Sequence, residues 1–137
     1  MNLTGKTALI TGASRGIGRA IATMYAEQGC NIAFTYIYED QEAQELIEQL
    51  QAKDIQVLCI KSDASKFDDA HEVLKQVIDT FGVIDILVCN AGITRDTLLM
   101  RMSENQWDEV LNINLKSVFN YCHAVTPYMI RQRHGSI

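Results

Sequence analysis

The feature that most constrains this chain is a set of three glycines directly after a short apolar segment. Residues 8–18 read ALITGASRGIG, so an apolar strand leads into Gly12, Gly16 and Gly18, and a helical pattern follows. Such a turn brings backbone N–H groups and a helix N-terminus to one place, where an anionic diphosphate can bind. The alternative is a tight strand-to-helix turn without a ligand. The flanking strand and helix favour a nucleotide-binding loop.

The spacing Gly-x-x-x-Gly-x-Gly gives each glycine a separate task. Gly12 permits the turn after the strand, Gly16 lets the backbone approach a phosphate, and Gly18 lets the helix pack closely on the strand. This spacing differs from the more usual Gly-x-Gly-x-x-Gly, but the same physical reasons apply to it.

Strand-like apolar segments alternate with amphipathic helical segments along the chain. The helical segments repeat apolar residues every three or four positions, whereas the strand segments are continuously apolar. This alternation predicts an α/β fold with a doubly wound parallel sheet, covered by helices on both faces. We expect four strands in the order 3-2-1-4, with residues 135–137 at the start of a fifth. The expected strands are residues 7–11, 31–36, 56–62 and 84–89.

Several residues predict where helices begin or bend. Ser65 with Asp68 three positions later resembles a capping box, and Ser103 is expected to cap a long helical stretch that reaches about residue 133. A break is expected near Asn112. Pro127 lies inside this stretch and should kink it, because proline removes the hydrogen bond to the carbonyl of His123.

The bulk properties of the chain exclude several functional classes. Its 137 residues suffice for one domain with a core, and its net charge of −5 argues against a nucleic-acid binder with a basic surface. Residues 1–6 lack the pattern of a secretory signal, and no apolar run approaches the roughly 20 residues that span a bilayer. The four cysteines are far apart, without metal-ligand spacing. We expect a cytoplasmic protein with free thiols and no metal, membrane or nucleic-acid partner.

The end of the second strand bears on which dinucleotide would bind. A cofactor with a free ribose 2′-hydroxyl favours an acid about 20 residues past the glycines, but Tyr36 holds that place. Arg15 lies in the glycine loop, where a guanidinium can hold a 2′-phosphate. This pattern favours NADP(H) over NAD(H). In the alternative, Arg15 is a solvated loop cation and Glu39, beyond the strand end, turns back to the ribose.

Two further strand ends carry candidate residues. Asp63 follows the third strand and could accept a hydrogen bond from an adenine amino group, but a turn or helix-capping aspartate is an equal local alternative. Asn90, Ala91 and Gly92 follow the fourth strand, where small residues leave room for a ring or ribose beside the first strand. Read alone, this tripeptide is an ordinary turn.

Together these segments resemble the short-chain dehydrogenase/reductase family. The resemblance is carried by residues 11–18, Asp63, residues 90–92 and the pair Asn114-Leu115, and it covers essentially the whole chain. Residues 90–102 and 131–137 are similar to the 3-oxoacyl-[acyl-carrier-protein] reductases within that family. The resemblance implies a Rossmann-like fold, with residues 1–137 forming an NADP(H)-binding domain that is an incomplete family domain.

The resemblance also implies roles for individual residues. The glycine loop would hold the pyrophosphate and adenosine ribose, Arg15 would meet the 2′-phosphate, and Asn114 matches the family's catalytic asparagine, which anchors a water. Packing at the helix break is the alternative role for Asn114. The implied cofactor-binding residues are Gly12, Ala13, Ser14, Arg15, Gly16, Ile17, Gly18, Tyr36, Asp63, Ala64, Asn90, Ala91 and Gly92.

For an intact protein, the resemblance implies NADPH-dependent reduction of 3-oxoacyl-[acyl-carrier-protein] to the 3-hydroxyacyl form in fatty acid biosynthesis. Acyl carrier protein would then be a partner, and the enzyme a homo-oligomer. The family also needs a serine and a Tyr-x-x-x-Lys pair, but none of the five tyrosines here has lysine four positions later. We therefore expect no turnover by these 137 residues alone. The alternative function is a catalytically inactive dinucleotide-binding fragment.

Overall fold

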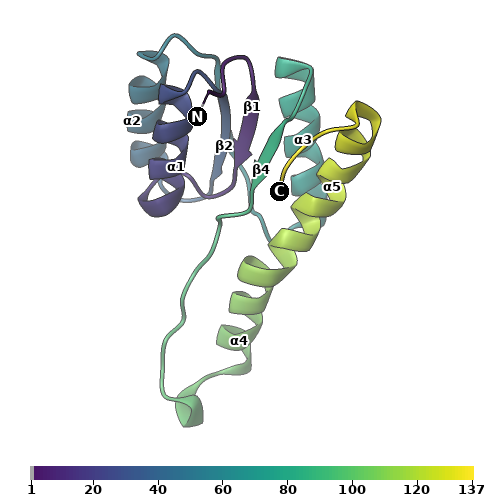
Figure 1. Cartoon of the computed structure of the whole chain (residues 1–137). Coiled ribbons are helices and arrows are strands. Elements are labelled where there is room, and N and C mark those ends of the chain that lie inside the picture. The colour runs from purple at the N-terminus through teal and green to yellow at the C-terminus, as the bar shows by residue number, and fades with distance from the viewer. Residues whose placement is uncertain (1) are drawn as a thin grey trace.

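The computed structural model describes residues 2–137, which form one parallel sheet with helices on both faces (Figure 1). The strand order β3-β2-β1-β4 confirms the predicted topology, and β1 pairs in parallel with both β2 and β4. The expected strands are all present, each within two residues of its predicted ends. The strands are β1 (Thr7–Ile10), β2 (Asn31–Tyr36), β3 (Val57–Lys61) and β4 (Ile86–Val88).

The helices follow the strands in the predicted alternation. Two lie on one face of the sheet, α1 and α2, and α3 and α5 lie on the other. The α-helices are α1 (Gly16–Glu27), α2 (Asp40–Gln51), α3 (Phe67–Phe81), α4 (Glu104–Val110) and α5 (Ser117–Gln132). A short 3₁₀ turn, η1 (Leu99–Arg101), precedes α4, and a π-helical turn, η2 (Leu111–Lys116), joins α4 to α5.

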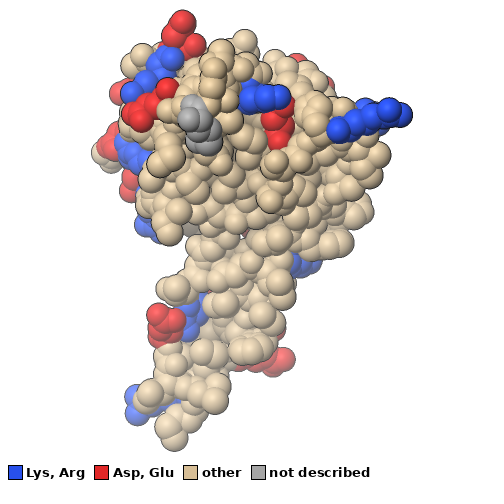
Figure 2. Space-filling model, in the orientation of Figure 1, with Lys and Arg blue, Asp and Glu red and all other residues tan. Residues whose placement is uncertain are grey.

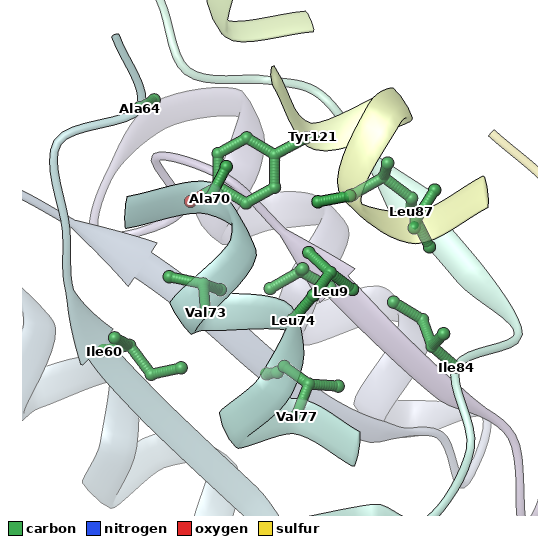
Figure 3. Close-up of a cluster of buried hydrophobic side chains, with 13 residues drawn as sticks. Leu9, Ile60, Ala64, Ala70, Val73, Leu74, Val77, Ile84, Leu87 and Tyr121 are labelled. Atoms are coloured by element: carbon green, nitrogen blue, oxygen red, sulfur yellow. The ribbon is translucent and has the colours of Figure 1, made fainter. Parts of the chain in front are cut away.

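Each face of the sheet has its own hydrophobic core, because side chains alternate along a strand. Ala8 and Ile10 of β1 pack with α1 and α2, whereas Leu9 between them packs with α3 and α5. Figure 3 shows this second core, in which Leu74 lies next to Leu9 and the Tyr121 ring lies next to Ala70. Burial on both faces explains why the strands read as continuous apolar runs in the sequence.

The helix starts confirm one capping prediction and correct another. Ser103 accepts a hydrogen bond from the backbone N–H of Gln106, whose side chain accepts one from the Ser103 N–H, so α4 begins with a capping box. The predicted box at Ser65 is wrong. The N-cap of α3 is Lys66, without a side-chain cap, because the N–H and hydroxyl of Ser65 both donate to Asp63.

The C-terminal part of the chain agrees with the predicted break and fifth strand. The π-helical turn η2 contains Asn112, where the break was expected, and α5 continues through Pro127 as one helix. Ser136 forms a parallel bridge to Ile86, and the Leu87 N–H donates to its carbonyl over 2.9 Å. Residues 135–137 thus begin to pair with the outer edge of β4.

Residues 90–102, α4 and η2 extend away from the sheet as a narrow arm (Figures 1 and 2). Its tip is strongly exposed, with 84% of Leu99 and 88% of Met100 accessible to solvent. Farther along, Leu115 of η2 and Phe119 of α5 are also exposed. No helix among residues 2–137 is long and apolar enough to cross a membrane.

Candidate functional site

A cleft of about 690 Å³ lies at the carboxyl ends of the strands, where ligands bind in open parallel sheets. Its volume is in the range of small-molecule sites, which is roughly 300–1,000 Å³. The cleft is lined by segments that are far apart in the sequence. They are Gly12 and residues 14–17 of the glycine loop, residues 35–39 at and after the end of β2, residues 62–65 after β3, residues 90–93 and Arg95 after β4, and Glu109, Asn112 and Ile113 of the arm.

The structure brings nearly all the predicted cofactor-binding residues to this one cleft. Ala13 and Gly18 are the exceptions, since Ala13 is buried in the core and Gly18 packs beneath the loop. The lining residues from the prediction are Gly12, Ser14, Arg15, Gly16, Ile17, Tyr36, Asp63, Ala64, Asn90, Ala91 and Gly92.

The loop glycines Gly16 and Gly18 differ in their surroundings. Gly16 has φ +58°, a conformation that side chains disfavour, and an added Cβ would meet nothing within 4 Å. The space beside Gly16 is therefore open to a ligand. Gly18 has the opposite environment, because an added Cβ would lie 2.8 Å from Cα of Ala13 and from the carbonyl oxygen of Gly12.

The N-terminus of α1 is suited to an anion. Arg15 is its N-cap in extended conformation, no side chain caps the first N–H groups, and the first turn contains no acid. Uncapped N–H groups and the positive end of the helix dipole both favour negative charge. The helix therefore presents donors to the cleft beside the open space at Gly16.

Glu39 turns back from the end of β2 onto the glycine loop. Its Oε1 lies 3.4 Å from Nη2 of Arg15, and its Oε2 accepts hydrogen bonds from Ser14 Oγ (3.4 Å) and Tyr38 N–H (3.3 Å). The Arg15 side chain remains 72% exposed, whereas that of Glu39 is 19% exposed. The acid thus turns back toward the loop and pairs with Arg15, whereas the alternative interpretation had Glu39 turning back to the ribose and Arg15 solvated.

The other acid after β2, Asp40, is directed elsewhere. Lys61 Nζ lies 2.9 Å from its Oδ1, and this contact is the main reason why the pKa of Asp40 is lowered. The same ammonium lies 5.7 Å from the centre of the Tyr36 ring. Desolvation, followed by the contact with Asp40, raises the pKa of Tyr36. Tyr36 lines the cleft as an uncharged side chain, and of these two acids only Glu39 lines the cleft.

Asp63 lines the cleft and also organises a turn. Its Oδ1 accepts from the Ser65 N–H (3.0 Å) and from the Ser65 hydroxyl (2.7 Å), and its own N–H donates to Asp69. The turn role predicted as the local alternative is therefore present. It places the carboxylate at the cleft wall, beside Ala64.

Asn90 ties the end of β4 to the end of β1. Its side-chain amide donates to the carbonyls of Thr11 (3.0 Å) and Gly12 (2.9 Å). The N–H groups of Asn90 and Ala91 both donate to the hydroxyl of Thr11 over 3.0 Å. These contacts fix residues 90–92 against the glycine loop, so the tripeptide is more than an ordinary turn.

Asn114 lies in the π-helical turn, and its side chain pairs with the peptide groups of Ile93. The Ile93 N–H donates to Asn114 Oδ1 over 2.8 Å, and Asn114 Nδ2 donates to the Ile93 carbonyl over 2.9 Å. Asn112 and Ile113 line the cleft, but Asn114 does not. The Asn114 amide therefore holds the loop after β4 against η2. A π-helical turn such as η2 is a feature that occurs often at functional sites.

Several lining residues carried too little signal for the sequence to single them out. Thr35 Oγ1 accepts from the Gly12 N–H over 3.3 Å, a contact that depends on strand register. Arg95 Nε lies 2.7 Å from Glu109 Oε2, and this ion pair joins the loop after β4 to α4. Arg95 is the largest cause of the lowered pKa of Glu109. The glycine loop and the candidate residues at the ends of the second, third and fourth strands had pointed to this edge of the sheet, but Thr35, Arg95 and Glu109 had not been singled out.

The fold and the cleft define an α/β protein with a Rossmann-like parallel sheet and a cleft at the carboxyl ends of its strands. The sequence model for short chain dehydrogenases matches residues 6–137, and the chain belongs to this family of oxidoreductases. It is 49% identical over 132 residues to the 3-oxoacyl-[acyl-carrier-protein] reductase FabG of Staphylococcus epidermidis, covering 96% of this chain and 54% of that protein. The chain is 43% identical over 137 residues to the FabG of Thermotoga maritima, and this alignment covers all of this chain and 55% of that protein. The chain thus spans about half the length of these curated relatives.

Solved structures agree with this family assignment. A short chain dehydrogenase from Burkholderia cenocepacia in complex with NADP superposes with a TM-score of 0.90 at 34% identity, covering 93% of this chain and 52% of that one. A mutant short-chain dehydrogenase/reductase from Serratia marcescens superposes with a TM-score of 0.89 at 31% identity, and the match again covers 93% of this chain and 52% of that one.

Proposed function

We propose that residues 1–137 form an NADP(H)-binding domain, with the cleft as the cofactor site. The observation that carries the proposal is the position of Arg15, which caps α1 at the mouth of the cleft beside the open space at Gly16. The residues present fit a dinucleotide. A helix N-terminus and a glycine cradle suit phosphates, and a cation at the rim suits a third phosphate.

Each part of the cleft receives a role in this proposal. Residues 12–18 bind the pyrophosphate and adenosine ribose, and Arg15 with Tyr36 surrounds the 2′-phosphate. Asp63 and the backbone of Ala64 hold the adenine, and residues 90–92 line the second ribose. Support comes from their common location on one cleft and from the relative from Burkholderia cenocepacia that binds NADP.

For an intact protein we propose NADPH-dependent reduction of 3-oxoacyl-[acyl-carrier-protein] to 3-hydroxyacyl-[acyl-carrier-protein], in fatty acid biosynthesis in the cytoplasm. The reductases from Staphylococcus epidermidis and Thermotoga maritima support this reaction. The bound dinucleotide supplies the hydride. Asn114 serves as a positioning residue that holds the loop after β4 beside the cleft through Ile93.

The partners proposed are acyl carrier protein, which presents the substrate, and further copies of this chain. Exposed apolar side chains on η2 and α5 support self-association, since 66% of Leu115 and 57% of Phe119 are accessible. Apolar groups arranged along one helical stretch are typical of protein interfaces.

A second candidate function is dinucleotide binding without catalysis. It is favoured by the tyrosines of residues 1–137, since none is followed four positions later by lysine. The two functions differ in whether the coding sequence continues past Ile137 into a serine and a Tyr-x-x-x-Lys pair, so sequencing beyond that position distinguishes them. Oxidation of NADPH by the purified 137 residues with a 3-oxoacyl thioester would contradict the expectation that these residues alone give no turnover.

The cofactor assignment is tested by titration of the chain with NADPH and NADH, followed by fluorescence. We expect NADPH to bind more tightly, and Arg15→Ala to weaken NADPH about tenfold with little change for NADH, as loss of one charged hydrogen bond predicts. Arg19→Ala is the matched control, because Arg19 lies on the same helix and pairs with Glu45 outside the cleft. Equal affinity of the unaltered chain for both dinucleotides would contradict the role of Arg15.

A further inference from the structure

Two histidines that the proposed function does not use lie in contact between α3 and α5. Nε2 of His71, on α3, lies 3.1 Å from Nδ1 of His123, on α5, and the two ring centres are 5.1 Å apart. Neither side chain lines the cleft. The expectation of no metal site rested on the spacing of cysteine and histidine along the sequence, whereas these histidines are 52 positions apart and meet only in the fold.

The two helices hold this pair on a rigid support. Helices α3 and α5 lie side by side on one face of the sheet (Figure 1), and the residues next to the histidines, Ala70 and Ala124, are both buried in the core. The ring centre of Phe67 lies 4.3 Å from that of His71 and 5.0 Å from that of His123. Packing of this kind positions the imidazoles before any ligand arrives.

The hydrogen bonds of His71 fix which of its nitrogens is free to bind an ion. Its Nδ1 lies 2.9 Å from the carbonyl oxygen of Phe67, which can only accept, so Nδ1 carries the proton. In the neutral ring the lone pair is then on Nε2, which faces His123. A backbone carbonyl bound to the other ring nitrogen is typical of histidines that bind metal ions.

The separation of the two facing nitrogens is close to what a single ion requires. Zinc binds an imidazole nitrogen at roughly 2.0–2.1 Å, so two such bonds at a tetrahedral angle place the nitrogens about 3.3 Å apart. The observed separation is 3.1 Å. Because the His123 side chain is exposed, its ring can turn slightly and direct Nδ1 to the same point as Nε2 of His71.

We propose that His71 Nε2 and His123 Nδ1 together bind one divalent transition-metal ion of the zinc class, which bridges α3 and α5. The ion replaces the proton between the two nitrogens, and His123 then carries its proton on Nε2 instead of Nδ1. No group of three or more His, Cys, Asp or Glu residues within 2–137 could hold a metal ion, so water fills the other positions around the ion. This site holds whether or not the cleft binds a dinucleotide.

Titration of the chelator-treated chain with Zn²⁺, followed by calorimetry, tests the inference. We expect one equivalent of Zn²⁺ to bind, and His71→Gln and His123→Gln each to weaken its binding by roughly tenfold or more, because each removes one of two protein ligands. His134→Gln is the matched control. It removes the third histidine of the chain, whose Nδ1 lies 3.5 Å from Asp85, and should leave the Zn²⁺ affinity unchanged.

Nitrogen-15 NMR of the unaltered chain identifies the atoms that bind, independently of how the variants fold. Zn²⁺ should shift the resonances of His71 Nε2 and His123 Nδ1 and move the His123 proton to Nε2, while the resonances of His134 stay in place. Mg²⁺, which prefers oxygen ligands, should shift none of them. Zn²⁺ should also raise the urea midpoint of the unaltered chain, because an ion that bridges two helices binds only the folded state.

Four results would overturn the inference. They are failure of the chain to bind Zn²⁺, an unchanged Zn²⁺ affinity in either His71→Gln or His123→Gln, an equal loss of affinity in His134→Gln, and imidazole nitrogens of His71 and His123 that do not shift. A loss of affinity in both variants of the pair, together with shifts at these two nitrogens, supports it.

Discussion

Among single residues, Gly18 has the tightest surroundings in the candidate site. A Cβ there would lie 2.8 Å from Cα of Ala13 and would also collide with the amide of Asn90. We expect Gly18→Ala to lower the free energy of unfolding by about 2 kcal/mol, because rigid backbone cannot move aside. Urea denaturation followed by circular dichroism measures this loss.

Gly16→Ala is the control for this prediction. A Cβ at Gly16 meets nothing within 4 Å, so only the strain of φ +58° remains, which costs about 1 kcal/mol. Equal losses in the two variants would show that the close approach of Gly18 to the backbone of Ala13 and Gly12 is not the cause.

The turn at the glycine loop was predictable because its signal lies within one short stretch of sequence. Gly12, Gly16 and Gly18 follow a strand and precede a helix, and that context fixes where the backbone must turn and approach. The role of Glu39 was left open, since the sequence offered its turning back to the ribose only as an alternative. Its pairing with Arg15 was not predictable, because it depends on how two loops distant in sequence are spaced by β1 and β2.

Among the helices and strands, α4 depends most on its cap, since it is short and none of its residues is buried. We expect Ser103→Ala to reduce the local stability of α4 by about 1 kcal/mol, the usual value of an N-cap hydrogen bond. Amide hydrogen exchange at Gln106, whose N–H donates to the Ser103 hydroxyl, should become faster by roughly fivefold.

Ser65→Ala provides the comparison. Ser65 precedes a helix in the same Ser-x-x-polar pattern, but its hydroxyl donates to Asp63 at 2.7 Å and caps nothing. Exchange in the first turn of α3 should therefore keep its rate. Faster exchange there, with no change at Gln106 in Ser103→Ala, would reverse the two assignments.

These two serines show what pattern can and cannot predict for an element. The capping box is a local pattern, and it succeeded at Ser103. It failed at Ser65 because Asp63, two residues earlier, competes for the same N–H and hydroxyl. The break near Asn112 was predictable, but its π-helical form was not, since it arises together with the pairing of Asn114 and Ile93.

For the whole molecule, a parallel sheet with a core on each face could be predicted from the alternation of apolar strands with amphipathic helices, whereas the strand order followed from the Rossmann-like resemblance. Most of the cleft lining after β1, β2, β3 and β4 was also predicted, but the contribution of the arm was not. The arm that contains Arg95 and Glu109 was not predictable, because its ion pair joins two segments whose only shared feature in the sequence is opposite charge.

The stability of the whole fold should depend on pH through a buried thiol. Cys30 is fully buried, and desolvation, followed by the charge of Asp85, raises its pKa from 9.0 to about 11. A raised pKa in the folded state means that the unfolded chain gives up the proton first as pH rises. The contribution of the thiol to the free energy of unfolding is therefore complete below pH 9, and it is lost as the pH rises from about 9 toward 11.

We expect the unaltered chain to lose about 1 kcal/mol of unfolding free energy between pH 8 and pH 10 in excess of the loss in Cys30→Ala. Alanine has no proton to release and fits the same space with the loss of one sulfur atom. Urea titrations of both proteins at the two pH values give the change in unfolding free energy with pH for each protein. Subtracting one change from the other cancels the contributions of the other titrating groups. Parallel losses in the two proteins would mean that the Cys30 thiol releases its proton as readily in the folded chain as in the unfolded one.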